Sequence, residues 1–143
     1  WTGSEGIVFT ATDPGALSDS DPATFTVTAV NDAPVVADIP DQTITEGSTF
    51  ATINLDNYVS DVDNLDAEMG WTWVGNSALT VSLDVNRVAT ITIPGVDWTG
   101  SETITFRATD PGLLYDEDGA TFTVTAISDA PVLAAIGDRI SGH

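Results

Sequence analysis

The stretch that decides the fold is WTGSETITFRATDPG at residues 98–112, because residues 1–15 spell nearly the same phrase, WTGSEGIVFTATDPG. The match continues without a gap at a constant offset of 97. Residues 1–41 therefore align with residues 98–138, and 29 of the 41 positions are identical. A long copy at a fixed period is typical of a tandem array of modules. We expect the chain to be a portion of such an array that opens inside one module.

Short segments with the composition of β-strands recur along the chain, with turn residues between them. They are rich in Val, Ile, Thr, Phe and Trp, and many alternate apolar and polar residues with period two. The predicted strands are residues 7–11, 24–30, 43–45, 50–55, 70–74, 79–83, 88–93, 103–108 and 121–127. Helical periodicity is missing, and residues 64–69 could form one turn at most. The chain is therefore predicted to be all-β.

The repeat also sets the expected module boundaries. Asn-Asp-Ala-Pro at residues 31–34 returns as Ser-Asp-Ala-Pro at residues 128–131, which marks a short connector. We expect the following parts: residues 1–30 as the last two strands of a truncated module, 31–36 as a linker, 37–127 as one complete module, and 128–143 as the next linker with a stub. Seven predicted strands fall within the complete module, which indicates a two-sheet sandwich.

The charge is very one-sided. The chain has 22 Asp and Glu residues against three Arg and no Lys, which gives a net charge of −19. Nucleic acids and anionic membrane surfaces demand the opposite sign, so neither is an expected partner. There is no Cys, hence no disulfide or thiolate chemistry. No apolar run approaches the length of about 18 residues that membrane insertion requires.

Acidic residues gather at strand ends and connectors, not along strand faces. Asp61 and Asp63 follow one predicted strand, Asp110 ends another, and Asn31 with Asp32 lies in the connector. In a sandwich, the loop that carries Asp61 and Asp63, the loop that begins at Asp110 and the incoming connector lie at the same end. Ca²⁺ takes six to eight oxygen ligands from carboxylates, Asn side chains and backbone carbonyls, so we expect a shared Ca²⁺ site there. The remaining loop acids are interpreted singly as solvated or turn-forming residues: Asp19, Asp21, Asp56, Asp116 and Asp118.

With these motifs the chain resembles cadherin-type repeats, and more narrowly the cadherin-like tandem repeats of large bacterial surface and secreted adhesins. The resemblance covers the whole chain. It rests on the connector, on Asp-Val-Asp at residues 61–63, on Ala-Thr-Asp at 108–110 and on Thr-Glu-Gly at 45–47. It implies a seven-stranded Greek-key β-sandwich of the cadherin/immunoglobulin type, preceded by the terminal β-hairpin of a truncated repeat. It also implies that Ca²⁺ sits between consecutive modules and stiffens the rod.

The resemblance assigns the metal ligands residue by residue. The first junction would use Asn31, Asp32, Asp61, Asp63 and Asp110. An incomplete second junction would use Glu46, Asp97, Glu102 and Asp129. The chain departs from the family pattern in two places: Asp97 and Glu102 lack its Asp-Arg-Glu spelling, and Ala occupies two ligand places of the connector. The implied function is that of a Ca²⁺-binding structural module in a large extracellular protein, secreted or on the cell surface. Such a module rigidifies a rod for cell-surface or homotypic adhesion.

Two other functional classes are compatible with parts of the sequence. Trp71 and Trp73 lie two residues apart on one strand face, so a pair of exposed indoles could stack on sugars. That alternative is a carbohydrate-binding module of a secreted polysaccharide-active protein, whereas a buried pair would be core. We expect no enzyme, because a single His and no Cys exclude Ser-His-Asp and Cys-His sets. Acids at the pole of a small sandwich also offer no obvious substrate cleft.

The expected partners follow from the array. They are neighbouring repeats of the same chain, and a homophilic, cell-surface or glycan partner for the whole array. Two strands alone are marginal in water, so residues 1–30 would either stay flexible or pair with another molecule. Of the two, we expect pairing with another copy by strand addition or exchange.

Overall fold

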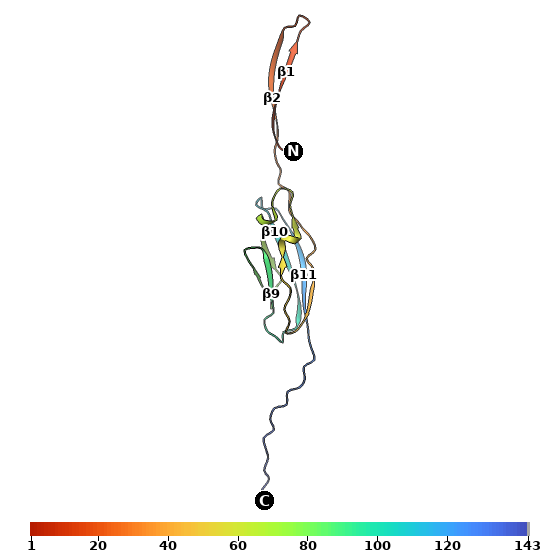
Figure 1. Cartoon of the computed structure of the whole chain (residues 1–143), viewed down its shortest axis with the longest axis vertical. Helices are drawn as coiled ribbons and strands as arrows, with labels where there is room; N and C mark the ends of the chain where they lie inside the picture. The colour runs from red at the N-terminus through yellow and green to blue at the C-terminus, as the bar shows by residue number, and fades with distance from the viewer. Residues whose placement is uncertain (143) are drawn as a thin grey trace. The chain divides into compact units, whose positions relative to one another are not determined.

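The first compact unit of the chain is a two-stranded hairpin. The computed structural model describes residues 1–142 and divides the chain into a unit of Trp1–Asp32 and a unit that begins at Ala33. In the first unit, β1 (Gly3–Thr12) pairs with β2 (Ser18–Val27) in antiparallel register from Gly3 opposite Val27 to Thr12 opposite Ser18 (Figure 1). Both strands extend further toward the turn than predicted, because β1 continues to Thr12 and β2 already begins at Ser18.

The turn of this hairpin is closed by an aspartate. The N–H of Asp13 donates to the carbonyl of Leu17 at 2.9 Å, and the N–H of Leu17 donates back to the Asp13 carboxylate at 2.9 Å. Ala16 adopts a positive φ of 65° inside the turn. Asp residues form such side-chain turns readily, which explains how Asp-Pro-Gly can reverse the chain here.

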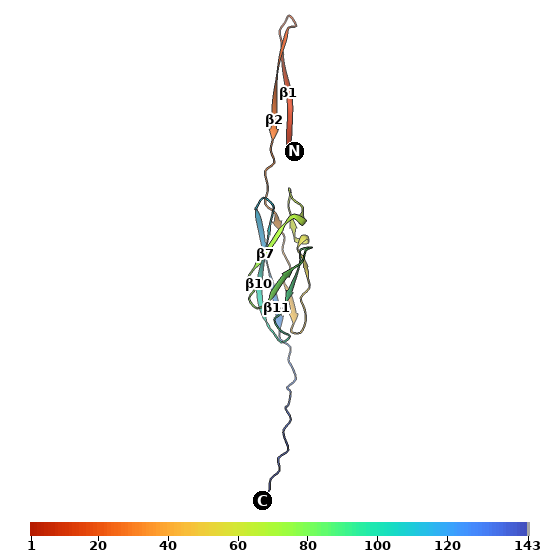
Figure 2. The same cartoon turned by 90° about the vertical axis from the view of Figure 1, so that its left-hand side faces the viewer.

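The second unit contains a four-stranded sheet in the order β4-β11-β10-β7. Its members are β4 (Gln42–Thr45), β7 (Gly70–Val74), β10 (Gly100–Thr109) and β11 (Tyr115–Thr125). Figure 2 labels three of these strands, β7, β10 and β11. β10 is antiparallel to both β7 and β11, whereas β4 runs parallel to β11. The long β10–β11 hairpin is the repeat counterpart of β1–β2.

Shorter strands form the opposing layer. β5 (Ile53–Asn54), β9 (Val88–Thr92) and β8 (Thr80–Leu83) make one sheet, and β3 (Val35–Val36) pairs with β6 (Val59–Ser60). Two 3₁₀ turns, η1 (Leu55–Tyr58) and η2 (Asp66–Glu68), complete the unit. The predicted all-β sandwich is confirmed, and the single helical turn expected within residues 64–69 is η2. The exact seven-strand Greek-key order stays a prediction.

The core lies between the two layers and follows the period-two pattern. Ile104, Phe106 and Ala108 alternate along β10, and Phe122 and Val124 continue the face on β11; all are at most 3% exposed. The Phe50 ring meets Phe122 edge to face, with centroids 5.2 Å apart. Aromatic pairs favour this geometry. The opposing layer supplies the rest of the core: Ile39, Ile53, Leu55, Val59, Leu79, Val81, Ala89 and Ile91.

The expected division of the chain into modules and linkers stays a prediction. After β11 ends at Thr125, residues 126–142 form neither strand nor helix. His143, the last residue of the expected stub, lies outside the described residues.

Candidate metal centre

The loops that carry the predicted acids meet at one end of the second unit. Ser60, at the end of β6, lies opposite Val35, where the chain enters the unit. Gly70, at the start of β7, lies opposite Thr109, at the end of β10. The loop of residues 61–69 and the turn of residues 110–114 therefore share an end with the entering segment, as predicted. Asn31 and Asp32 are the last residues of the first unit.

Asp61 organises the first of these loops. One carboxylate oxygen, Oδ1, accepts the N–H groups of Asp63 at 2.7 Å and Asn64 at 2.9 Å. The other oxygen, Oδ2, is buried and has no hydrogen-bond partner among the described residues, and the same is true of Asn64 Oδ1. Two buried oxygen acceptors without donors are costly, because water has been removed and nothing replaces it. Their chemistry fits a bound cation.

Asp110 is the buried acid of this end. It is 3% exposed, although charged residues are rarely buried unless they are paired. Its Oδ1 accepts the N–H of Leu114 at 2.8 Å, and its N–H donates to the Leu114 carbonyl at 2.9 Å. This is the turn that Asp13 makes in the first unit, and Leu113 repeats the positive φ of Ala16. The Asp-Pro-Gly sequence therefore forms the same turn in both copies of the repeat.

The carboxylates alone do not make a complete metal site. Within residues 1–142, no group of three or more His, Cys, Asp and Glu side chains is close enough to hold a metal ion. A hard cation at this end would therefore also need neutral oxygens. Ca²⁺ accepts Asn, backbone carbonyl and water oxygens, and Asn64 offers one such oxygen beside Asp61.

The four residues assigned to the second junction have local roles or are exposed. Glu46 ties the end of β4 to the chain after β11, because its carboxylate accepts the N–H of Ile127 and its N–H donates to the Thr125 carbonyl. Asp97 and Asp129 are exposed. The role of this set in binding a metal stays a prediction.

Glu102 holds the loop between β7 and β8. Its two carboxylate oxygens accept the backbone N–H groups of Ser77 at 2.9 Å, Ala78 at 2.6 Å and Leu79 at 3.2 Å. Partial burial works to raise the pKa of Glu102, but the three hydrogen bonds together outweigh it, so the pKa lies below its ordinary value. Hydrogen bonds to the ionised form have this effect.

The two tryptophans of β7 do not form an exposed platform. Trp71 is 8% exposed and belongs to the core, and Trp73 is half-buried against it. Stacking on a sugar needs an open indole face, so this geometry gives no support to the carbohydrate-binding alternative. The buried Trp71 Nε1 has no hydrogen-bond partner among the described residues.

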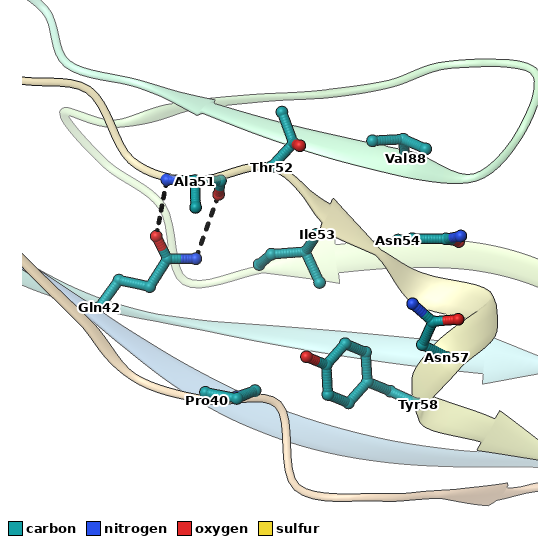
Figure 3. A pocket seen from close by; sticks show the side chains of 9 residues that line it. All are labelled: Pro40, Gln42, Ala51, Thr52, Ile53, Asn54, Asn57, Tyr58 and Val88. Atoms are coloured by element: carbon teal, nitrogen blue, oxygen red, sulfur yellow. Dashed lines mark hydrogen bonds between the residues drawn. The ribbon is translucent and has the colours of Figure 1, made fainter.

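A hollow of about 540 Å³ opens at the edge of the sandwich between β4 and β5 (Figure 3). The side-chain amide of Gln42 crosses one end of it, donating to the Ala51 carbonyl at 3.1 Å and accepting the Ala51 N–H at 2.8 Å. The amide therefore replaces a strand pair that the backbone does not make. Thr52, Asn54, Asn57 and Tyr58 are the other polar groups around the hollow, and no lining residue carries a charge.

The comparisons with known proteins place the second unit in a family. The family model of the bacterial Ig domain matches residues 31–127, which is more than half of the chain. The chain belongs to the bacterial Ig domain family. A comparison with the curated proteins gave no significant match. No helix in the described part of this bacterial Ig domain is long and apolar enough to cross a membrane.

Solved structures show that the bacterial Ig domain has a cadherin-like fold. It is similar to the structure titled PcdhgB3 EC1-4, with a TM-score of 0.52, 18% identity, and coverage of 87% of this chain and 32% of that one. The protocadherin gammaB7 EC3-6 cis-dimer structure is also similar. Its TM-score is 0.52 and its sequence identity is 20%, and the match covers 89% of this chain and 32% of that one. The chain thus spans about a third of the length of these structures. Identity this low supports the fold alone, and the predicted cadherin/immunoglobulin-like fold is confirmed.

Three acidic residues have structural roles that differ from the predicted ones. Asp116 and Asp118 are not the solvated or turn-forming residues that the sequence predicts. Their carboxylates accept the N–H groups of Val36 at 2.8 Å and Ile39 at 2.7 Å and hold the first segment of the module against β11. Their alternation on one strand was the available signal. The interpretation of Asp56 as a solvated acid is also wrong, because its carboxylate pairs with Arg87 at 2.6 Å.

Proposed function

We propose that the chain is a Ca²⁺-binding structural module of an extracellular adhesion-type protein, in which it acts as a rigid spacer between neighbouring repeats. The observation that supports this best is the pair of buried, unpartnered oxygens, Asp61 Oδ2 and Asn64 Oδ1, at the end where Asp110 is buried. A net charge of −19 adds a general demand for cations. The cadherin-like fold and the repeated sequence support the spacer role.

The residues that would hold the ion are those predicted for the first junction, together with Asn64. Asp61, Asp110 and Asn64 come from the two loops that share an end, and Asp63 lies in the same loop as Asp61. Asn31 and Asp32 would approach from the connector. Ca²⁺ supplies two positive charges there, which offset the mutual repulsion of the carboxylates and restrict the connector. Glu46, Asp97, Glu102 and Asp129 would serve a second junction.

The proposed location and partners are those of a repeat in an extracellular array. A module of this kind works outside the cell, secreted or on the surface, where Ca²⁺ is plentiful. Its partners would be neighbouring repeats, with homophilic or cell-surface adhesion arising from the array. Its role would be mechanical and not catalytic.

Calcium titration of the intact chain tests the proposal. Isothermal calorimetry should show saturable Ca²⁺ binding, and EDTA should lower the melting temperature. An ion that is present at a hundred times Kd stabilises the native state by about 2.7 kcal/mol, which corresponds to roughly 11–22 °C in melting temperature for a unit of this size.

Matched variants separate metal binding from loop stability. Asp61→Ala should abolish both the titration heat and the effect of EDTA. Asp84→Ala is the control, because the exposed Asp84 makes the same kind of turn by accepting the N–H groups of Asn86 at 2.8 Å and Val88 at 2.9 Å. It should destabilise the fold but keep Ca²⁺ binding. A melting temperature that is indifferent to EDTA in dilute salt would refute the metal site.

A further inference from the structure

We propose that the apolar face of the β1–β2 hairpin is an interaction surface for a β-sandwich half-module of the type formed by residues 33–97, joined ahead of Trp1. The face consists of Ile7, Phe9, Phe25 and Val27, which are 44%, 57%, 52% and 47% exposed. These four side chains all lie on one unpaired face of the hairpin. Apolar groups on this scale are rarely left open to water without a partner.

The second unit shows what covers such a face. At the offset of 97, the four positions correspond to Ile104, Phe106, Phe122 and Val124, and each residue type is the same. The first three of these counterparts are fully buried and Val124 is 3% exposed. Their cover is the layer built from residues 33–97, in which Phe50 packs against Phe122. The face of β1–β2 therefore has the composition of a core surface.

The two hairpins also present this face with the same geometry. Gly3 pairs with Val27 and Thr12 with Ser18, as Gly100 pairs with Val124 and Thr109 with Tyr115. The Asp13 turn reproduces the hydrogen bonds of the Asp110 turn. Because the register and turn coincide, the side chains of the two faces have the same spacing.

Polar groups make the fit specific. The counterpart of Glu5 is Glu102, whose carboxylate accepts three consecutive backbone N–H groups from a loop of the half-module. The counterparts of Asp19 and Asp21 are Asp116 and Asp118, which accept N–H groups from its first segment. Glu5, Asp19 and Asp21 are all exposed on β1–β2. They are placed to accept the same backbone donors from a second half-module of this type.

An extended chain tests the proposal. Residues 33–97 are duplicated directly ahead of Trp1, which recreates the natural Asp97–Trp98 junction at the new join. Amide hydrogen exchange is then followed by NMR in the intact and extended chains. We expect the protection of the β1–β2 amides to rise at least a hundredfold on extension, to the level of β10–β11. Protection of the second unit serves as the internal reference and should not change.

Variants of the extended chain test the specificity of the contact. Phe9→Ala should remove most of the gained protection, and Glu5→Gln should lower it by about tenfold. The control is Val8→Thr, which places on the opposite face the residue that the second copy carries at Thr105, and it should leave the gain intact. Glu5→Gln is the milder of the two changes that should reduce the protection. If Phe9→Ala prevents folding, Glu5→Gln therefore still tests the contact.

Three outcomes would overturn the proposal. The β1–β2 amides could exchange equally fast in both chains, or Glu5→Gln could match the unsubstituted extended chain. The intact chain could also form dimers by light scattering and already protect the hairpin, in which case a second copy is the partner. None of these results depends on Ca²⁺, so they are distinguishable from a failure of the proposed metal site.

Discussion

Replacing Glu102 by Gln tests whether one carboxylate holds the loop between β7 and β8. The substitution keeps the size of the side chain but removes its charge and turns one acceptor oxygen into an NH₂ donor. In the native structure, Oε2 serves Ser77 and Leu79 while Oε1 serves Ala78. Whichever way the Gln amide is oriented, at least one backbone N–H then faces a donor.

The size of the expected loss in stability follows from these hydrogen bonds. Leu79 is 1% exposed, so its N–H has little access to water. A buried donor that loses its acceptor costs about 1–3 kcal/mol, and the remaining bonds weaken because a neutral acceptor replaces a charged one. We expect Glu102→Gln to lower the free energy of unfolding by about 2 kcal/mol at neutral pH, or roughly 8–16 °C in melting temperature for a unit of this size.

The loss should also depend on pH in a defined direction. The pKa of Glu102 is lower in the folded state than its ordinary value, so the native state binds fewer protons at this site than the unfolded state does. Its stabilisation is complete above the ordinary Glu pKa of about 4.3 and is lost as the pH falls through the folded pKa. The difference between the native chain and Glu102→Gln should therefore shrink in strong acid.

Urea unfolding followed by tryptophan fluorescence, at neutral and acid pH, measures both effects. The control is Glu5→Gln, the same change at the exposed repeat counterpart, which should alter the main transition by less than about 0.5 kcal/mol. A loss at Glu102 no larger than at Glu5, or one that is constant with pH, would refute the role assigned to this carboxylate.

Two further substitutions test the packing of the sandwich. Phe106→Ala should lower the free energy of unfolding in urea by about 3–5 kcal/mol, because this side chain is fully buried. The same change at its exposed counterpart, Phe9→Ala, should hardly alter the main unfolding transition. Equal effects of the two changes would contradict the core assignment. Gly75→Ala should cost about 2 kcal/mol, because φ is +99° and an added Cβ would lie 2.3 Å from the Thr103 carbonyl oxygen. Gly95→Ala meets nothing within 4 Å and is the control in thermal melts; a harmless Gly75→Ala would show that the backbone there can shift freely.

The strands were predictable where both composition and alternation pointed to β-structure. Residues 70–74 match β7 in full, and residues 88–93 differ from β9 by one residue. The start of β11 was missed because Tyr115–Gly119 is rich in acids and resembles a loop. Cross-strand pairing with β10 and the hydrogen bonds of Asp116 and Asp118 make it a strand. The two-residue strands β3 and β6 carry too little sequence to show a period.

The candidate site was predictable in its location but not in its detail. The end of the sandwich followed from topology, because loops after successive antiparallel strands alternate between the two ends. Asn64 was not singled out, since only its buried and unpartnered Oδ1 distinguishes it from other loop amides. Likewise, the three N–H groups that Glu102 binds lie 23 to 25 residues away in sequence, and only the folded chain brings them to it.

The parallel pairing of β4 with β11 has a mechanical consequence. The chain enters the second unit beside Ser60, at one end, and β11 runs toward the other end. A pull on both termini of this unit would draw β4 and β11 along their length in opposite directions. Their ladder, from Gln42 opposite Phe122 to Thr45 opposite Thr125, is then loaded in shear, and its evenly spaced bonds share the force. Such a ladder must break all at once, whereas a hairpin that is pulled open at its ends unzips one bond at a time.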